Sequence, residues 1–139
     1  MATRSTIAVE HQDGTVTQVY CHWDGYLDHN GKLLQKHYNN AELAKKLVSL
    51  GSISLLNERI DPVGQHSFEK PEKGTTIFYA RDRNEKLRVN SFQSIDELVR
   101  KGQQEEYNYL YSVATGTWYV STDNEPFEPL EKALEENAQ

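Results

Sequence analysis

The chain has 139 residues, the length of one domain, and 37% of them are hydrophobic and 26% charged, as in ordinary globular proteins. Aromatic residues make up 10%, which excludes a wholly disordered chain. The formal net charge is −6, whereas a general nucleic-acid-binding protein is expected to be basic. We therefore predict a single folded domain over residues 1–139 and no general nucleic-acid binding.

Cys21 is the one cysteine of the sequence, so an internal disulfide and a four-cysteine zinc site are excluded. The first residues lack the apolar stretch of a secretory signal. The sequence also lacks an apolar run of the length needed to cross a membrane. We therefore predict a cytoplasmic protein without membrane association.

The N-terminal half predicts a β-hairpin followed by two helices. Residues 5–10 and 15–20 alternate apolar and polar side chains, and Asp13-Gly14 between them is a strong turn signal. Helical spacing of apolar residues predicts a short helix over 32–38. Asn39 or Asn40 then caps a second helix, which ends at Gly51. Its apolar stripe consists of Leu43, Ala44, Leu47 and Val48.

Two more hairpins and two more helices are predicted in the C-terminal half. Residues 75–80 and 87–92 have the composition of paired strands, and 107–113 and 117–121 form a final hairpin. Both faces of the final hairpin are apolar, so we expect it to be covered on both sides and Trp118 to be buried. Ser94 caps one helix, and a last helix is expected over 126–137.

These elements predict an α+β fold, with an antiparallel sheet built largely from hairpins and two to four helices packed on one face. The acidic C-terminal helix or tail, at about 123–139, holds six acidic residues and one basic residue. Few of its residues are apolar, so we expect the body to stay folded without it. Exposed hairpin edges make a homodimer possible.

The segment 20–26 contains the densest cluster of aromatic and reactive side chains. Trp23 and Tyr26 are candidates for a ligand-binding pocket, against the alternative that they only pack over the end of a strand. Groups that bind metals occur at four nearby positions: Cys21, His22, Asp24 and His29. Their spacing matches no zinc pattern, so we predict no metal site. A lone cysteine beside a strand is usually a small buried hydrophobe, which disfavours cysteine catalysis.

The sequence concentrates basic side chains at four positions: Arg81, Arg83, Lys86 and Arg88. Arg81 and Arg83 share a face if the strand continues, and arginine pairs suit bidentate binding of phosphate. The alternative is a solvated, charged hairpin turn. Glycine loops of the kinds that bind nucleotides for hydrolysis or as dinucleotides are absent from the sequence. We identify no catalytic residue and no cofactor, although a small hydrolase or nuclease using His22 and Asp24 remains an alternative.

The acidic C-terminal region is a candidate surface for a protein partner. Its candidate contact residues are Glu128, Glu131 and Glu135. A row of carboxylates can occupy a basic groove on a partner. The alternative is an ordinary solvated helix face, which is often rich in glutamate.

Six segments of the sequence carry a resemblance to a known family: residues 4–10, 13–15, 19–26, 30–34, 78–83 and 106–111. Together they resemble a family of small uncharacterised proteins encoded by bacteriophages and prophages. The resemblance implies a phage accessory protein that acts in the cytoplasm of the bacterial host. It supplies no catalytic residues.

Four functions follow as hypotheses. The first is a non-enzymatic protein that binds and inhibits a host component, in particular one of antiviral defence. The second is sequestration of a nucleotide signal, with Arg81, Arg83 and Arg88 on phosphate and Trp23 or Tyr26 stacked on a base. The third is the small hydrolase or nuclease, and the fourth a structural or assembly factor.

Overall fold

The computed structural model describes residues 2–123 and 125–138. The chain begins with the predicted hairpin, formed by β1 (Ser5–Glu10) and β2 (Val16–Trp23) in antiparallel pairing. In the turn, Thr15 donates its backbone N–H to Asp13 Oδ1 at 3.0 Å, and Gly14 has a φ of 89°. A positive φ of this kind favours glycine, which explains why Asp-Gly identified the turn.

The described residues form an eight-stranded sheet in the order β4-β3-β2-β1-β6-β7-β8, with β5 also paired to β2. The remaining strands are β3 (Ile53–Leu55), β4 (Ile77–Phe78), β5 (Asn90–Phe92), β6 (Tyr107–Ser112), β7 (Thr117–Thr122) and β8 (Glu128–Pro129). The α+β class is confirmed, but the sheet is mixed, because β1 pairs with β6 and β2 pairs with β3 in parallel. Such pairs need long crossovers, which local hairpin signals do not reveal.

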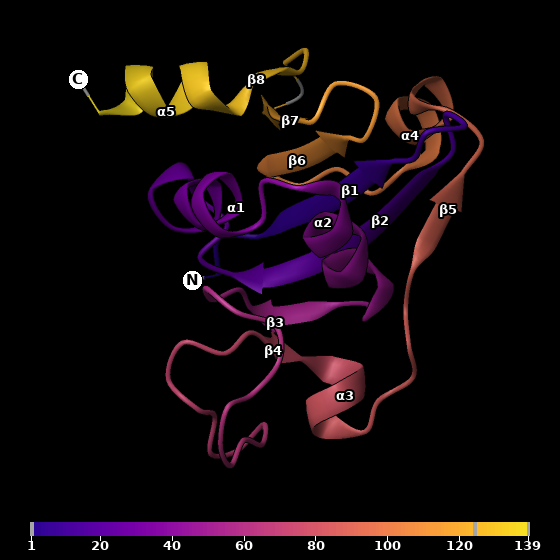
Figure 1. Cartoon of the computed structure of the whole chain (residues 1–139). Helices are drawn as coiled ribbons and strands as arrows, with labels where there is room; N and C mark the ends of the chain where they lie inside the picture. The colour runs from indigo at the N-terminus through magenta and orange to yellow at the C-terminus, as the bar shows by residue number, and fades with distance from the viewer. Residues whose placement is uncertain (1, 124, 139) are drawn as a thin grey trace.

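Helices pack on both faces of this sheet. The π-helical turn η1 (Leu27–Gly31) leads into α1 (Lys32–His37), and the others are α2 (Ala41–Ser49), α3 (Tyr79–Arg83), α4 (Ile95–Lys101) and α5 (Leu130–Asn137). Figure 1 shows α1 and α2 lying across the sheet, with α3 beyond β4 and α4 beside β5. Leu98 of α4 packs with Ala8, Val16 and Leu110, whose side chains lie on the opposite face from the α1 and α2 core. The expectation that all helices cover one face is therefore wrong.

The predicted caps of α2 and α4 are present. Asn40 Oδ1 accepts the backbone N–H of Leu43 at 2.8 Å, and Ser94 Oγ accepts that of Glu97 at 3.1 Å. Each bond satisfies a donor at a helix N-terminus that has no partner within the helix. Local capping chemistry was therefore sufficient to locate these two helix starts.

The principal core lies between the sheet and α1, α2 and α5. Trp118 is fully buried there, and its indole N–H donates to the backbone carbonyl of Tyr38 at 3.0 Å, which confirms the expected burial. Leu130 of α5 is also fully buried and belongs to the same core. The C-terminal helix therefore contributes more to the packed interior than its few apolar residues suggested.

The hairpin predicted between 75–80 and 87–92 is wrong. Residues Tyr79–Arg83 form α3, β4 pairs with β3, and β5 pairs with β2. Asp82 Oδ2 accepts the backbone N–H of Phe78 at 2.8 Å, which favours a helical turn over a continued strand. Residues two apart on a helix point in different directions, so Arg81 and Arg83 do not share a face.

Candidate functional site

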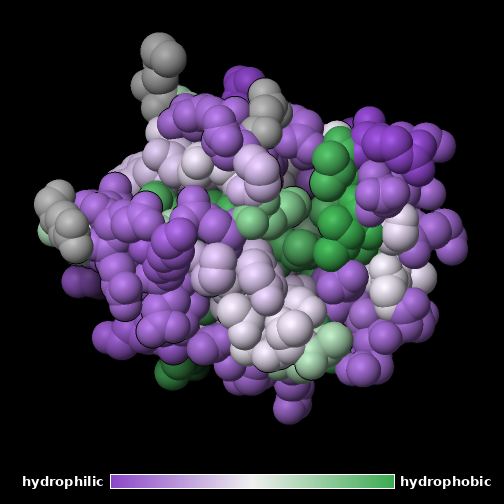
Figure 2. Space-filling model, turned by 90° about the horizontal axis from the view of Figure 1, so that it is seen from above, coloured by the Kyte–Doolittle hydropathy of each residue, from purple (hydrophilic) through white to green (hydrophobic). Residues whose placement is uncertain are grey.

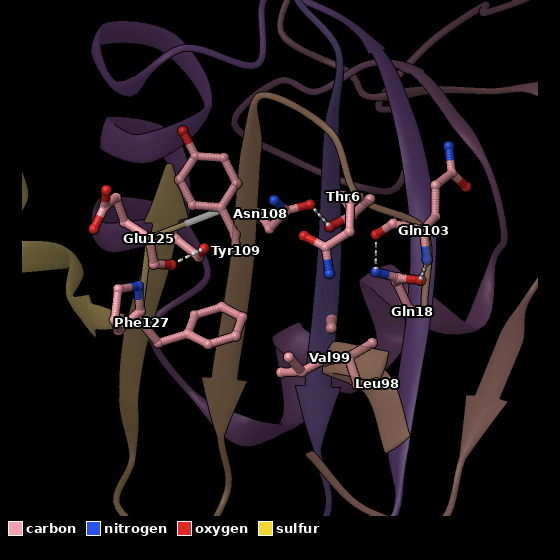
Figure 3. Close-up of a pocket in the computed structure, with 13 residues that line it drawn as sticks. Thr6, Gln18, Leu98, Val99, Gln103, Asn108, Tyr109, Glu125 and Phe127 are labelled. Atoms are coloured by element: carbon pink, nitrogen blue, oxygen red, sulfur yellow. Dashed lines mark hydrogen bonds between the residues drawn. The ribbon is translucent and has the colours of Figure 1, made fainter. Parts of the chain in front are cut away.

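The sheet face that packs against α4 contains a hollow of about 440 Å³. We call it the amide hollow, because amide side chains form much of its lining. Thr6, Gln18 and Asn108 contribute from β1, β2 and β6, and Gln103 follows α4. Leu98 and Val99 of α4 and Phe127 before β8 contribute apolar walls. Figure 3 shows the Phe127 ring and Val99 on the apolar side and the amides on the other.

The polar residues of the amide hollow are held by two hydrogen-bond groups. Thr6 Oγ1 donates to Asn108 Oδ1 at 2.8 Å, and Asn108 Nδ2 donates to the backbone carbonyl of Glu105 at 2.9 Å. Gln18 Nε2 donates to the carbonyl of Gln103 at 3.0 Å, while Gln18 Oε1 accepts the Gln103 N–H at 3.1 Å. A side-chain amide has two N–H donors, so Asn108 and Gln18 each keep one N–H outside these bonds.

The amide hollow has little charge. Among the described residues that line it, Glu125 is the single side chain charged at neutral pH. Such a lining offers hydrogen-bond donors and apolar contact, but neither a pair of groups for proton transfer nor a counter-charge for a phosphate. The arrangement therefore suits an uncharged polar group.

A second, basic hollow is lined by residues of β2 and of the segment 83–90. Its parts have volumes of about 260 Å³ and 480 Å³ and share Tyr20, Ser52, Lys86 and Arg88. Arg83 and Tyr79 line the smaller part. The Arg83 guanidinium lies 4.8 Å from the Phe68 ring centre and 5.5 Å from that of Tyr79, which are cation–π distances. Arg83 also pairs with Glu85 at 2.6 Å.

The two hollows are neighbours on the same sheet. Gln18 and Gln103 line both of them. The strand register places Asn108 beside Thr6 and Thr6 beside Tyr20. From Asn108 in the amide hollow to Tyr20 in the basic hollow is thus two strand spacings, about 10 Å.

Arg81, a predicted ligand-binding residue, instead makes hydrogen bonds within the protein. Its Nη1 donates to the carbonyl of Ile60 at 2.6 Å, its Nη2 to that of Thr76 at 2.8 Å, and its Nε to Asp82 Oδ1 at 2.9 Å. Burial would raise the pKa of Asp82, but hydrogen bonds from Arg81 and the Phe78 amide outweigh burial and leave that pKa lowered. Arg81 therefore anchors α3 to the chain around it.

The structure brings together only some of the predicted ligand-binding residues. Arg83 and Arg88 line the basic hollow, whereas Trp23 and Tyr26 contribute to neither hollow. Trp23 is 44% exposed and packs edge-on against His22 at a ring-centre distance of 4.6 Å. Tyr26 is 39% exposed and lies near His29.

The residues that sequence reasoning missed lie mostly in the amide hollow. They are Thr6, Gln18, Gln103, Asn108 and Phe127, together with Tyr20 and Tyr79 in the basic hollow. One signal pointed to three of them. Thr6, Gln18 and Asn108 are polar, yet a residue two positions away on the same face of each strand is apolar.

The groups considered for catalysis lie at the end of β2 and just after it. Burial raises the pKa of the Cys21 thiol to about 11, so the thiol is protonated at neutral pH and a weak nucleophile. His22 Nδ1 lies 2.6 Å from the Tyr20 hydroxyl, and Asp24 occupies a turn with a φ of 54°. Within residues 2–123 and 125–138, no cluster of three His, Cys, Asp or Glu side chains is suited to hold a metal ion.

The candidate acidic residues lie on β8 and α5. Glu131 and Glu135 are exposed on α5, and Glu128 on β8 is half-buried. The opposite side of α5 carries the buried Leu130 and Ala133. The two exposed carboxylates therefore face solvent, as either the partner-binding or the solvated-helix interpretation requires.

Comparisons with protein-family models, curated proteins and solved structures found no match to this chain. In the part of the chain that the structure describes, no helix is both long and apolar enough to cross a bilayer. The two hollows are therefore the features of this chain that bear on its function.

Proposed function

We propose that this chain is a non-enzymatic binding protein that sequesters a small phosphate-bearing ligand in the basic hollow. The supporting observation is the gathering of Arg83, Lys86 and Arg88, against the one carboxylate of Glu85, around one hollow of a chain whose net charge is −6. Like charges held together repel one another, and a bound anion relieves that repulsion. Arginine forks match the geometry of phosphate oxygens.

The ion pairing of these cations supports an anionic ligand. Lys86 and Arg88 have no ion pair with any of the residues that the structure describes. Arg83 pairs with Glu85, but more than half of its side chain is exposed. Tyr20 and Tyr79 contribute aromatic side chains to the lining. The donors are thus available to a ligand without breaking a buried structural contact.

The resemblance to bacteriophage proteins gives this binding a biological setting. A phage accessory protein in the cytoplasm of a bacterium would inhibit antiviral defence by withdrawing a signalling nucleotide from the host component that senses it. No turnover is required, since stoichiometric binding removes the signal. Sequestration also agrees with the protonated thiol of Cys21.

Titration calorimetry with inorganic triphosphate tests the proposal. The variant Arg83→Gln, Lys86→Gln, Arg88→Gln should bind at least about a hundredfold more weakly than the unchanged protein, because hydrogen bonds to charged groups contribute roughly 1.5–3 kcal/mol each. The matched control, Lys36→Gln, Lys45→Gln, Lys132→Gln, removes the same charge from exposed helical positions and should bind normally. Equal binding by the two triple variants, or no binding by the unchanged protein, would refute the proposal.

A host protein is the second candidate target, because Glu131 and Glu135 are exposed together on α5. Native mass spectrometry of the protein purified from phage-infected bacteria separates the two. A retained mass of nucleotide size supports sequestration. A retained host polypeptide, lost in the variant Glu131→Gln, Glu135→Gln, favours the protein inhibitor instead.

A further inference from the structure

We infer that the amide hollow receives the uncharged, planar part of the ligand whose phosphate the basic hollow holds, so that the ligand is a nucleotide. The inference rests on the proposed function for the phosphate end and extends it to the choice of ligand. It assigns the base to Asn108, Val99 and Phe127, and the sugar to the wall formed by Gln18 and Gln103.

The hydrogen bonding of Asn108 and Gln18 determines the polarity of the ligand group that fits the amide hollow. Asn108 and Gln18 are buried, and each retains one amide N–H beyond its structural bonds. A ring oxygen or ring nitrogen accepts a hydrogen bond from the second N–H of Asn108, and a sugar hydroxyl accepts one from Gln18, whereas a hydrocarbon chain accepts neither.

The apolar side chains that line the amide hollow determine the shape of the ligand group that fits there. The Phe127 ring points into the hollow from the side of β8, and Val99 of α4 borders it (Figure 3). Figure 2 shows hydrophobic residues gathered toward the right of the upper face, the side on which Figure 1 places α4. An aromatic ring of the protein and an aliphatic side chain together favour a flat ligand that buries its faces and directs its edge toward the amides.

The charge of the lining excludes the phosphate from this hollow. Lys and Arg are missing from the described residues that line it, and Glu125 would repel an anion. A phosphate placed here would lose its hydration without gaining a counter-charge. The anionic end must therefore lie beyond Gln18 and Gln103, in the basic hollow.

The distance between the hollows fits one small molecule. Asn108, Thr6 and Tyr20 are aligned across three adjacent strands, which gives a span of about 10 Å. Gln18 and Gln103 form the shared wall that the sugar would cross. A nucleoside phosphate has its base and its phosphates at the two ends of such a span.

The test compares inorganic triphosphate with ribonucleoside triphosphates of the four common bases, by titration calorimetry. Val99→Tyr fills the hollow from an exposed position, since Val99 is 53% exposed, and Val63→Tyr makes the same change at a position that is 84% exposed and lines neither hollow. At least one nucleotide should bind the unchanged protein and Val63→Tyr ten times or more as tightly as inorganic triphosphate. Val99→Tyr should remove that advantage and leave inorganic triphosphate binding unchanged.

Phe127→Ala, which removes a wall instead of filling the space, gives a second measurement should Val99→Tyr fail to fold. It should weaken nucleotide binding and spare inorganic triphosphate. Equal affinity for inorganic triphosphate and all four nucleotides in the unchanged protein would overturn the inference and leave the proposed function standing. Binding of a free nucleoside that Val99→Tyr abolishes, without any binding of inorganic triphosphate, would refute the proposed function but support the amide hollow as the base site.

Discussion

The two faces of the sheet are built from alternate residues of the same strands, yet they have different contents. On the face under α1, α2 and α5, Ile7, Tyr109 and Trp118 are buried among apolar side chains. On the face toward α4, their neighbours Thr6 and Asn108 are buried but polar. The first face is closed by helices, whereas α4 covers only part of the second and leaves the amide hollow beside it.

Burial alone therefore does not separate residues that only stabilise the fold from residues that line a hollow. Residues on both faces are buried, but on the face toward α4 the buried amides of Gln18 and Asn108 line a hollow and each keep one N–H outside the bonds described above. We therefore expect substitutions on the closed face to reduce stability. Substitutions around the hollows should instead reduce ligand binding.

The largest expected effect compares two adjacent residues of β7 that point to opposite faces. Trp118→Ala should reduce the free energy of unfolding by about 3–5 kcal/mol, because a fully buried indole is replaced by a cavity. Tyr119→Ala should cost clearly less, since Tyr119 is only half-buried on the other face. Urea denaturation measures both, and equal losses would contradict the division of roles between the faces.

A somewhat smaller effect is expected from α5, which closes the first face. Leu130→Ala should reduce the free energy of unfolding by about 2–5 kcal/mol, because Leu130 is fully buried in the core. Glu131→Ala, at the exposed neighbouring position, should change the free energy of unfolding by no more than about 0.5 kcal/mol. Thermal melting of both variants tests whether α5 is part of the closed face. An unchanged melting temperature for Leu130→Ala would show that it is not.

The smallest effect concerns residues 61–74, a loop that belongs to neither face. Hydrogen bonds from the Val63 amide, the Arg59 guanidinium and the Gly64 amide lower the pKa of Glu72 from 4.5 to about 2. The stability that Glu72 contributes is therefore present above pH 4.5 and is lost as the pH falls toward 2. Glu72→Gln should lower the melting temperature at pH 7.

The difference between Glu72→Gln and the unchanged protein should shrink steadily when the melts are repeated at lower pH. Glu69→Gln in the same loop is the matched control, because no hydrogen bond to its carboxylate occurs among the described residues. It should behave as the unchanged protein does at each pH. A difference for Glu72→Gln that stayed constant with pH would contradict the assigned cause of its lowered pKa.

The sequence predicted those parts of the fold that depend on nearby residues. Asp13-Gly14 located the first turn, and Asn40 and Ser94 located two helix starts, because each acts on backbone groups within three residues of itself. The helical turn at Tyr79–Arg83 was missed because the strand propensity of residues 75–80 concealed the local bond from the Phe78 amide to Asp82, and because Arg81 also donates to Ile60, some twenty residues away along the chain. Strand propensity could not show that contact.

The candidate site was only partly predictable for the same reason. Arg83 and Arg88 lie close in sequence and were identified together. The amide hollow draws on β1, β2, β6 and the residues after α4, so it exists only after the sheet has formed. Its one local signal was that Thr6, Gln18 and Asn108 are polar residues within strands. The alternation pattern alone assigns such polar strand residues to the solvent-exposed face.

The parallel pairing of β1 with β6 has a consequence for how the chain folds. Ser5 pairs with Tyr107, so the middle of the sheet joins the two ends of the sequence. During synthesis, the first hairpin leaves the ribosome with one edge of β1 unpaired until residues near 112 have emerged. Because closing such long loops is entropically unfavourable, a high contact order places folding toward the slower, millisecond-to-second end of the range for small domains. Throughout that interval the nascent edge is open to pairing with other chains.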